Sequence, residues 1–180
     1  MIRPWAKLSS TIHSDHRIFK VRHDRVVNPR TKAEHEMVIL ENPDWVNIIA
    51  LTPDDELVMV EQYRQGSEAV ELEIPGGIVD NGASPLESGL RELREETGYE
   101  GDNARIIGSL FANPAIMNNQ VHTILLDNCK KKHALELDEG EDISTQLVPV
   151  SDIAGLIRAG TIRHSIIVAA LQLFALERGA

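Results

Sequence analysis

Short apolar runs separated by polar clusters occupy most of this chain and predict a protein rich in β-strands. Two of these runs lie on either side of residues 52–56, TPDDE, a sequence typical of a hairpin turn. The predicted strands are residues 17–21, 37–40, 46–51, 57–62, 104–111 and 121–126.

Helical spacing of apolar residues marks three further segments. The central helix begins at Ser84, an N-cap followed by Pro85 and by Glu87, which completes a capping box, and it ends at Gly98. Two more helices are predicted, at 152–159 with Ser151 as its cap and from 164 or 165 to 176. Strands combined with a central helix and terminal helices indicate a mixed α/β layered fold.

Composition narrows the class of protein. With 180 residues, 42% of them hydrophobic, the chain suits one domain with a sizeable core. The net charge of -10 argues against a nucleic-acid partner, and the single Cys129 excludes an internal disulfide. The N-terminus lacks the apolar core of a signal peptide, and the most apolar stretch, 166–176, is too short to span a bilayer. We therefore expect a cytoplasmic protein without a membrane partner.

Candidate chemistry lies on one face of the central helix. Glu92 lies beside both Glu95 and Glu96, because residues three and four apart share a helix face. Their mutual repulsion would become attraction around a hard, oxygen-seeking cation such as Mg²⁺. From the helix alone, a solvated acidic surface remains an equal alternative.

The stretch from 77 to 99 resembles the Nudix box, G-x5-E-x7-R-E-U-x-E-E-x-G-U, where U is a bulky apolar residue. The matching residues are Gly77, Arg91, Glu92, Leu93, Glu95, Glu96 and Gly98, with Tyr99 at the last position. One position departs, because the family's first glutamate falls on Ala83. In the family this glutamate helps to hold the loop and the box arginine. We expect Glu87, four residues before Arg91, to replace it in part through an ion pair.

The wider sequence is similar to the ADP-ribose pyrophosphatase branch of that family. The segments 60–64, VEQYR, and 71–77, ELEIPGG, match the branch, as does Pro114 beyond the box. The resemblance implies an α/β/α sandwich with a mixed sheet at 46–180, preceded by a small β extension at 1–45. It also implies a hydrolase that uses Mg²⁺, with Mn²⁺ as the alternative metal, and cleaves ADP-ribose or related nucleoside diphosphate sugars to a nucleoside monophosphate and a sugar phosphate. Relatives of this branch are usually homodimers joined through such extensions.

The resemblance assigns roles to individual residues of the metal site. Glu92 and Glu96 are the expected principal ligands, with Glu95 close by and the Gly76 carbonyl as a further ligand. The acidic loop 138–142 resembles the mobile loop that carries the general base. Glu139 is therefore the candidate base and Glu141 a candidate metal ligand, and the order of these two could be reversed. A solvated, charged turn is the alternative for this loop.

Substrate contacts are expected from other segments. The resemblance makes Arg64 a phosphate contact and places Glu73 in the substrate site. Asn118 and Asn119 are candidates for hydrogen bonds to a ribose or sugar, and loop formation explains them equally well. Trp5 and Trp45 could stack on a base, although buried tryptophans are common. Two alternative functions are a hydrolase of another nucleotide conjugate, such as a dinucleotide cofactor, and a non-catalytic Nudix-fold sensor of nucleotide sugars.

Overall fold

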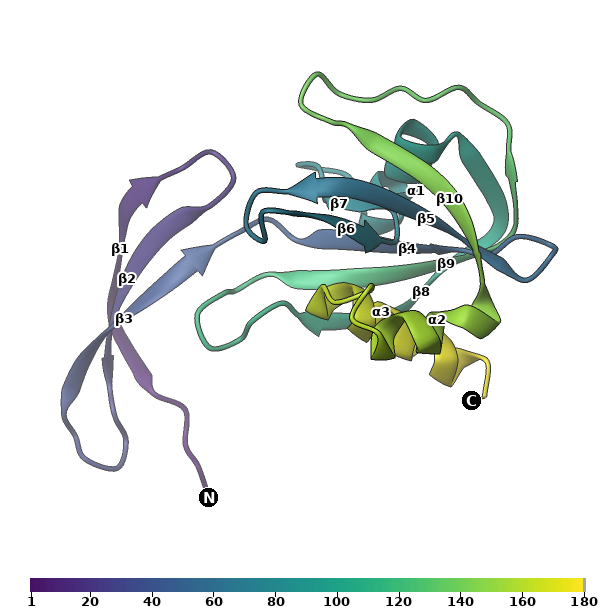
Figure 1. Ribbon diagram of the computed structural model, residues 1–180. Helices are drawn as coiled ribbons and strands as arrows, with labels where there is room; N and C mark the ends of the chain where they lie inside the picture. The colour runs from purple at the N-terminus through teal and green to yellow at the C-terminus, as the bar shows by residue number, and fades with distance from the viewer. Residues whose placement is uncertain (180) are drawn as a thin grey trace. The chain divides into compact units, whose positions relative to one another are not determined.

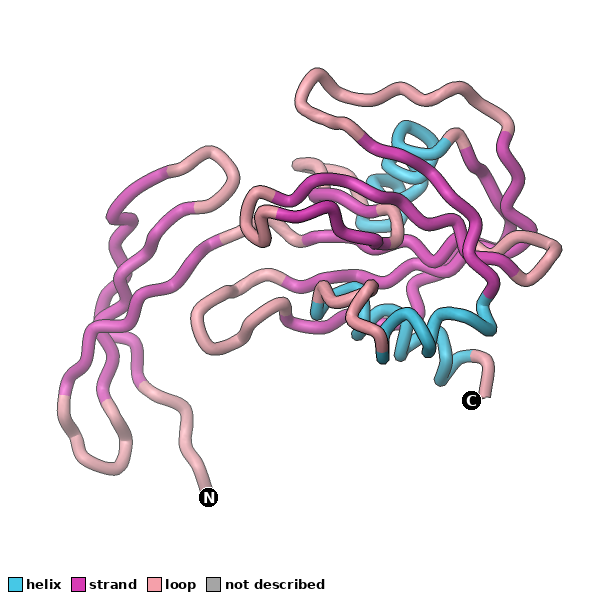
Figure 2. Tube along the Cα trace, in the orientation of Figure 1, coloured by secondary structure: helices cyan, strands magenta, loops and turns pink. Residues whose placement is uncertain are grey.

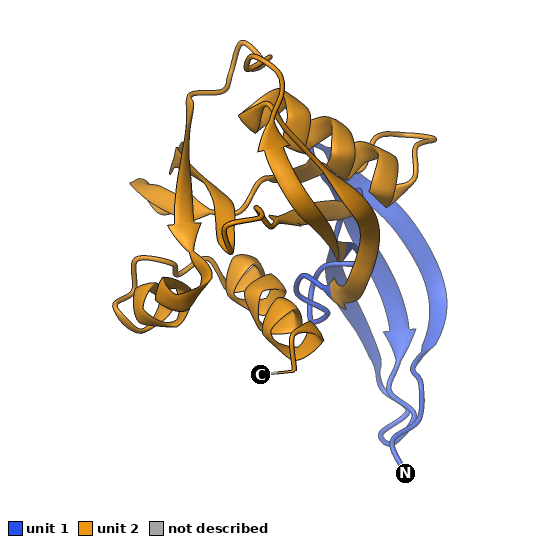
Figure 3. Ribbon diagram, turned by 90° about the vertical axis from the view of Figure 1, so that its right-hand side faces the viewer, with its two compact units in different colours: residues 1–43, 111–120 blue, residues 44–110, 121–180 orange. Residues whose placement is uncertain are grey.

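The computed structural model describes residues 1–179 and divides them into two compact units. The first unit contains residues 1–43 and 111–120, and the second contains residues 44–110 and 121–180 (Figure 3). The sequence did not indicate that residues 111–120 group with the N-terminal segment. No helix among residues 1–179 is long and apolar enough to cross a membrane.

The first unit is an antiparallel meander of three strands, β1 (Ala6–Asp15), β2 (Lys20–Val27) and β3 (Glu34–Glu41). The strand expected at 17–21 is displaced, because Arg17 adopts a left-handed conformation with φ 66° and its amide donates to Asp15 at 3.1 Å. These contacts make a turn, and β2 begins at Lys20. Asp24 is buried in the sheet and is paired with Lys7 and Arg22.

The second unit contains two sheets. The order of the first is β7 (Gly76–Ile78), β4 (Trp45–Ala50), β9 (Gln120–Lys131) and β8 (Tyr99–Phe111). The order of the second is β10 (Ile143–Pro149), β5 (Glu56–Arg64) and β6 (Ala69–Glu73). Strands β4 and β9 are parallel, and the pairs β4–β7, β5–β10 and β5–β6 are antiparallel, so the unit mixes both kinds of pairing.

The turn expected at 52–56 is present, but it joins two sheets. The Thr52 amide donates to the Glu56 carbonyl at 2.9 Å, and Leu51 pairs with Leu57 through one isolated bridge. Beyond that bridge β4 and β5 diverge, each into its own sheet (Figure 1). The local turn was thus predictable, whereas the separation of its two strands was not.

Three helices cover the sheets of the second unit: α1 (Pro85–Thr97), α2 (Val150–Arg158) and α3 (Ser165–Glu177) (Figure 2). Because successive residues of β4 point to opposite faces, Ile48 packs in the cluster that contains Leu93 of α1, and Ile49 packs in the cluster that contains Phe174 of α3. The apolar run of β4 is buried on both faces for this reason. Helix α2 begins at Val150 with Pro149 as its N-cap, so Ser151 lies inside the helix and is not the expected cap.

Candidate active site

Local sequence fixes both ends of α1, as expected. The Glu87 amide donates to Ser84 Oγ at 3.2 Å, and the Glu87 carboxylate accepts the Ser84 amide at 2.8 Å, which completes the capping box. Gly98 ends the helix in a left-handed conformation with φ 73°. The helix that carries the glutamates is therefore stabilised by caps at both ends.

Strand β7 begins with two glycines, and their backbone lies against these glutamates. A Cβ atom on Gly77 would lie 2.5 Å from the carboxyl carbon of Glu92, and one on Gly76 would overlap the Val46 carbonyl oxygen. The Gly76 amide donates to Glu96 Oε2 at 3.1 Å. Gly77 is thus required because the Glu92 carboxylate lies in contact with the strand, and Gly76 is required because the β4 backbone does.

The two innermost carboxylates are held out of water. Glu96 is only 3% exposed, and burial raises its pKa to about 8, with further contributions from the charges of Glu92 and Glu141. Burial also raises the pKa of Glu92, and Glu95 and Glu141 act in the same direction against the opposing effect of Arg91. The site thus concentrates negative charge that its own residues do not neutralise completely.

Arg91 partly compensates this charge. Its guanidinium contacts Glu92 at 2.7 Å and Glu95 at 2.5 Å, and two nitrogens contact one carboxylate oxygen of Asp80 at 3.1 and 2.8 Å. The ion pair expected from Glu87 is not among the contacts of residues 1–179, because the capping box engages the Glu87 carboxylate. Asp80, which the sequence analysis missed, is the partner in its place.

The acidic loop reaches the same site through Glu141. This side chain is half-buried and accepts the Asp138 amide at 3.0 Å, and its charge raises the pKa of both Glu92 and Glu96. Glu139 is exposed. The loop follows a segment tied to α1, because the Glu136 amide donates to the Glu95 carbonyl at 2.9 Å.

The donor set fits a hard divalent cation that shares its coordination with a substrate. Within residues 1–179, no group of three or more His, Cys, Asp or Glu side chains is arranged to hold a metal ion. Mg²⁺, however, is usually bound by one or two carboxylates together with substrate phosphates. The carboxyl groups of Glu92 and Glu96, which lie against the Gly76–Gly77 backbone, supply such a pair.

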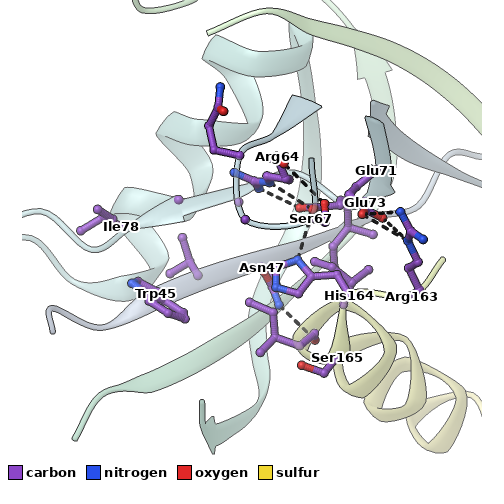
Figure 4. A pocket seen from close by; sticks show the side chains of 18 residues that line it. Trp45, Asn47, Arg64, Ser67, Glu71, Glu73, Ile78, Arg163, His164 and Ser165 are labelled. Carbon is purple, nitrogen blue, oxygen red and sulfur yellow. Dashed lines mark hydrogen bonds and ion pairs between the residues drawn. The ribbon is translucent and has the colours of Figure 1, made fainter. Parts of the chain in front are cut away.

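A cavity of about 820 Å³ opens beside the glycine strand. Its lining includes Gly76, Gly77, Trp45, Asn47 and Arg64 (Figure 4). Its wall therefore continues directly from the carboxylate site, since Gly77, which lies against Glu92, and Gly76, whose amide donates to Glu96, both line the cavity.

Charged side chains on the cavity wall are organised by strand β6. Glu71 and Glu73 are two residues apart and share one face of the strand. Glu73 accepts Arg64 Nε at 3.1 Å, Arg64 Nη2 at 2.7 Å and His164 Nδ1 at 3.1 Å, while Glu71 is paired with Arg163. Hydrogen bonds and ion pairs from Arg64 and His164 outweigh the effect of burial and lower the pKa of Glu73 to about 2.

Comparison with known proteins identifies the family. The NUDIX domain family matches residues 41–171, most of the chain. The chain belongs to the Nudix family. It is 32% identical to the methanol dehydrogenase activator of Bacillus methanolicus over 89% of this chain and 87% of that protein. It is 30% identical to the ADP-ribose pyrophosphatase of Bacillus subtilis over 73% of this chain and 71% of that protein.

A solved structure supports the fold of this Nudix protein. The crystal structure of an ADP compounds hydrolase superposes with a TM-score of 0.85 at 22% sequence identity, covering 97% of this chain and 94% of that one. The α/β/α sandwich expected from the Nudix box is confirmed, as is membership of the hydrolase family with its ADP-ribose pyrophosphatase relatives.

Some expected substrate residues of the Nudix protein lie apart from the cavity lining. Asn118 Oδ1 accepts the Asn42 amide at 2.9 Å. Asn119 is 1% exposed, and its side-chain atoms have no hydrogen-bond partner among the described residues. Both belong to the first unit, whereas every residue lining the cavity belongs to the second.

Part of the cavity wall was not predicted from the sequence. Neither Arg163 nor His164 was assigned to the substrate site. His164 does occupy the N-cap position of α3, but its side chain makes no cap hydrogen bond and contacts Glu73 instead. The only signal was two adjacent basic residues before a helix together with two alternating glutamates in a strand, and sequence alone did not pair them.

Proposed function

We propose that this Nudix protein is a Mg²⁺-dependent pyrophosphatase that hydrolyses ADP-ribose or a related nucleoside diphosphate sugar to a nucleoside monophosphate and a sugar phosphate. The observation that carries this proposal is the carboxylate pair of half-buried Glu92 and buried Glu96 against the Gly76–Gly77 backbone, at the edge of a cavity that Arg64 lines. The resemblance to the ADP-ribose pyrophosphatase of B. subtilis supports the substrate class. Mn²⁺ is the alternative metal.

Different residues of the site bind the metal ion and the phosphate in the proposed reaction. Glu92, Glu96 and the Gly76 carbonyl hold the cation, with Glu95 and Glu141 beside them, and bound Mg²⁺ supplies charge neutralisation and a lowered pKa for the attacking water. Arg64 Nη1 has no partner among residues 1–179, so it remains to donate to a phosphate oxygen.

Glu139 supplies the base in this proposal. Its carboxylate accepts a proton from the attacking water when the loop approaches the substrate, with Glu141 as the alternative base. The position of Glu139 in an exposed loop agrees with a group that reaches the reacting atoms only after the substrate binds.

Product analysis tests the proposal. Wild-type protein and Glu96→Gln are incubated with ADP-ribose, GDP-mannose, UDP-glucose and NADH, with and without Mg²⁺. We expect Mg²⁺-dependent release of a nucleoside monophosphate by the wild type and a loss of at least about 100-fold in the variant. Wild-type protein that binds a nucleotide sugar and Mg²⁺ without turnover would refute the enzyme and favour a sensor.

A second candidate is activation of a dehydrogenase. It is favoured by the relative from B. methanolicus, which is named a methanol dehydrogenase activator and matches 89% of this chain. The test adds wild-type protein to an NAD-dependent alcohol dehydrogenase and measures its turnover. An increase that persists in Glu96→Gln would indicate activation without hydrolysis.

A second copy of this chain is the proposed partner of the first unit. No apolar side chain of the first unit, residues 1–43 and 111–120, is buried. The three-stranded sheet of this unit exposes Leu8, Ile12 and Val38. A three-stranded sheet normally requires a packed apolar face. Light scattering should therefore show a homodimer, and Leu8→Glu combined with Ile12→Glu should give monomers; a wild-type monomer would contradict this proposal.

The remaining expectations concern location and other partners. We propose a cytoplasmic protein, because its only cysteine, Cys129, is buried and burial raises its thiol pKa to about 12, as in a protein without redox chemistry of its own. The net charge of -10 supports the absence of a nucleic-acid partner. Retention of the protein on a nucleic-acid column at low salt would contradict this expectation.

A further inference from the structure

Arg64 lies within the field of two sets of carboxylates. It is bound by Glu73 through Nε at 3.1 Å and Nη2 at 2.7 Å. Glu73 also makes the largest contribution to the raised pKa of Arg64, and Glu96 and Glu141 add to it in the same direction. Arg64 favours the ionised form of Glu96, so a guanidinium free to turn toward Glu96 would pair with that carboxylate and compete with a metal ion for it.

Glu73 is itself fixed in place. Its side chain is only 2% exposed, on β6, and Oε1 also accepts His164 Nδ1 at 3.1 Å (Figure 4). The His164 backbone is anchored as well, because its carbonyl accepts the amides of Ile167 and Val168 in the first turn of α3. Glu73 therefore accepts a hydrogen bond from His164 at the start of α3, and the same carboxylate binds Arg64.

This arrangement leaves Arg64 with one defined orientation. Two of its nitrogens are occupied by Glu73, and Nη1 has no partner among the residues that the structure describes. Arg64 lines the cavity, and its bidentate contact with Glu73 leaves Nη1 unpaired among the described residues and keeps the guanidinium from rotating onto Glu96. The two hydrogen bonds from Arg64 to Glu73 thus both position and restrain the guanidinium.

We propose that Glu73 and His164 form a brace that holds Arg64 away from the metal-binding glutamates of α1. Both are positioning residues, since they act on metal and substrate through Arg64. The inference rests on the proposed function, because it requires a cation at Glu92 and Glu96. It also gives Glu73 a role other than direct substrate binding.

Calorimetric titration of metal-free protein with Mn²⁺, and then with Mg²⁺, tests the brace without any turnover. Four proteins form a double-mutant cycle: wild type, Glu73→Gln, Arg64→Ala and the variant with both changes. We expect Glu73→Gln to weaken binding by about tenfold, because Arg64 then competes for Glu96. In the Arg64→Ala background the same change should alter affinity by less than about twofold.

The cycle separates the brace from a simple effect of charge. If Glu73 acts only through its own negative charge, its effect will be equal in both backgrounds, and an additive cycle would overturn the brace while leaving the proposed function intact. Equal affinity of Glu73→Gln and wild type would overturn it as well. Wild-type protein that binds neither metal would overturn both the brace and the proposed function.

Variants of His164 provide an independent arm, since this side chain is 38% exposed and tolerates change better than buried Glu73. The amide nitrogen of His164→Asn can take the place of Nδ1, so it should keep wild-type metal affinity, whereas His164→Ala should weaken it by about threefold. His122→Ala, which removes another histidine–carboxylate contact of the same unit, is the matched control and should change nothing. Equal affinity of all three variants would remove His164 from the brace.

Discussion

Metal binding to this protein should release a proton from Glu96. Its side chain is 3% exposed, and burial together with the charges of Glu92 and Glu141 raises its pKa to about 8. A metal ligand must be ionised, so binding displaces the proton that the metal-free carboxyl group carries. A group with this pKa is about 90% protonated at pH 7 and about 10% protonated at pH 9. We therefore expect about 0.9 proton released per metal at pH 7 and about 0.1 at pH 9.

The same shift predicts how stability depends on pH. The pKa of Glu96 is higher in the folded protein than the usual glutamate value of 4.5, so the folded state binds more protons between pH 4.5 and about 8. The contribution of Glu96 to stability is therefore fully present at low pH and is lost as pH rises through that window. The full shift corresponds to at most roughly 5 kcal/mol, and relaxation around the carboxylate will reduce it. Mg²⁺ should accordingly raise the Tm more at pH 8.5 than at pH 6.

Calorimetry measures the proton release directly. Mg²⁺ or Mn²⁺ is titrated into metal-free protein in buffers of different ionisation enthalpy, and the slope of the observed enthalpy against the buffer enthalpy gives the number of protons released. Glu96→Gln is the control, because its amide still accepts from Gly76 but cannot ionise. A release below about 0.2 proton at pH 7, or the same release at pH 7 and pH 9, would refute a neutral Glu96 in the metal-free site.

Three further predictions concern other parts of the site. Glu139→Gln should lower kcat by about 10²- to 10⁴-fold without loss of substrate binding, and a loss below about threefold in a steady-state assay would refute Glu139 as the base. Ser84→Ala should cost about 1 kcal/mol in urea unfolding, because it removes the capping box with Glu87; an unchanged midpoint would contradict that role. Asp80→Ala should change stability by less than about 1 kcal/mol, since both side chains of its ion pair are exposed. It should nevertheless weaken Mn²⁺ binding by about threefold, because Arg91 then pairs only with Glu92 and Glu95 and competes more strongly for Glu92, and unchanged affinity would show that Asp80 does not restrain Arg91.

Structural features that depend on residues close together in the sequence were predictable. The bounds of α1 follow from Ser84, Pro85 and Gly98, because caps act within one turn of the helix. Helix α3 was also predicted within one residue at its start, since its apolar run contrasts with the preceding polar segment. Gly77, which the sequence placed at the first position of the Nudix box, lies in close contact with Glu92.

Features that depend on distant segments meeting were not predictable from local pattern. Strand β1 was missed because its residues are almost all exposed, so no clear apolar face marks it. The contact of His164 with Glu73 joins residues 91 positions apart. Asp80 was likewise not assigned to Arg91, because the loop must fold back on the helix over 11 positions before the two side chains meet.

The position of Ala83 shows how the site accommodates a departure from the family pattern. A glutamate there would be expected to hold the box arginine, and Glu87 cannot replace it while its carboxylate is engaged by Ser84. Asp80 contacts the guanidinium of Arg91 with two nitrogens on one oxygen, at 3.1 and 2.8 Å, and thereby supplies the missing charge from the same loop. Without this carboxylate, the Arg91 guanidinium would pair only with Glu92 and Glu95, the groups that the proposed metal ion requires. Asp80 and Glu73 therefore act in parallel: each gives an arginine beside the site an anionic partner outside α1, which weakens the competition of that arginine with a cation for the α1 carboxylates.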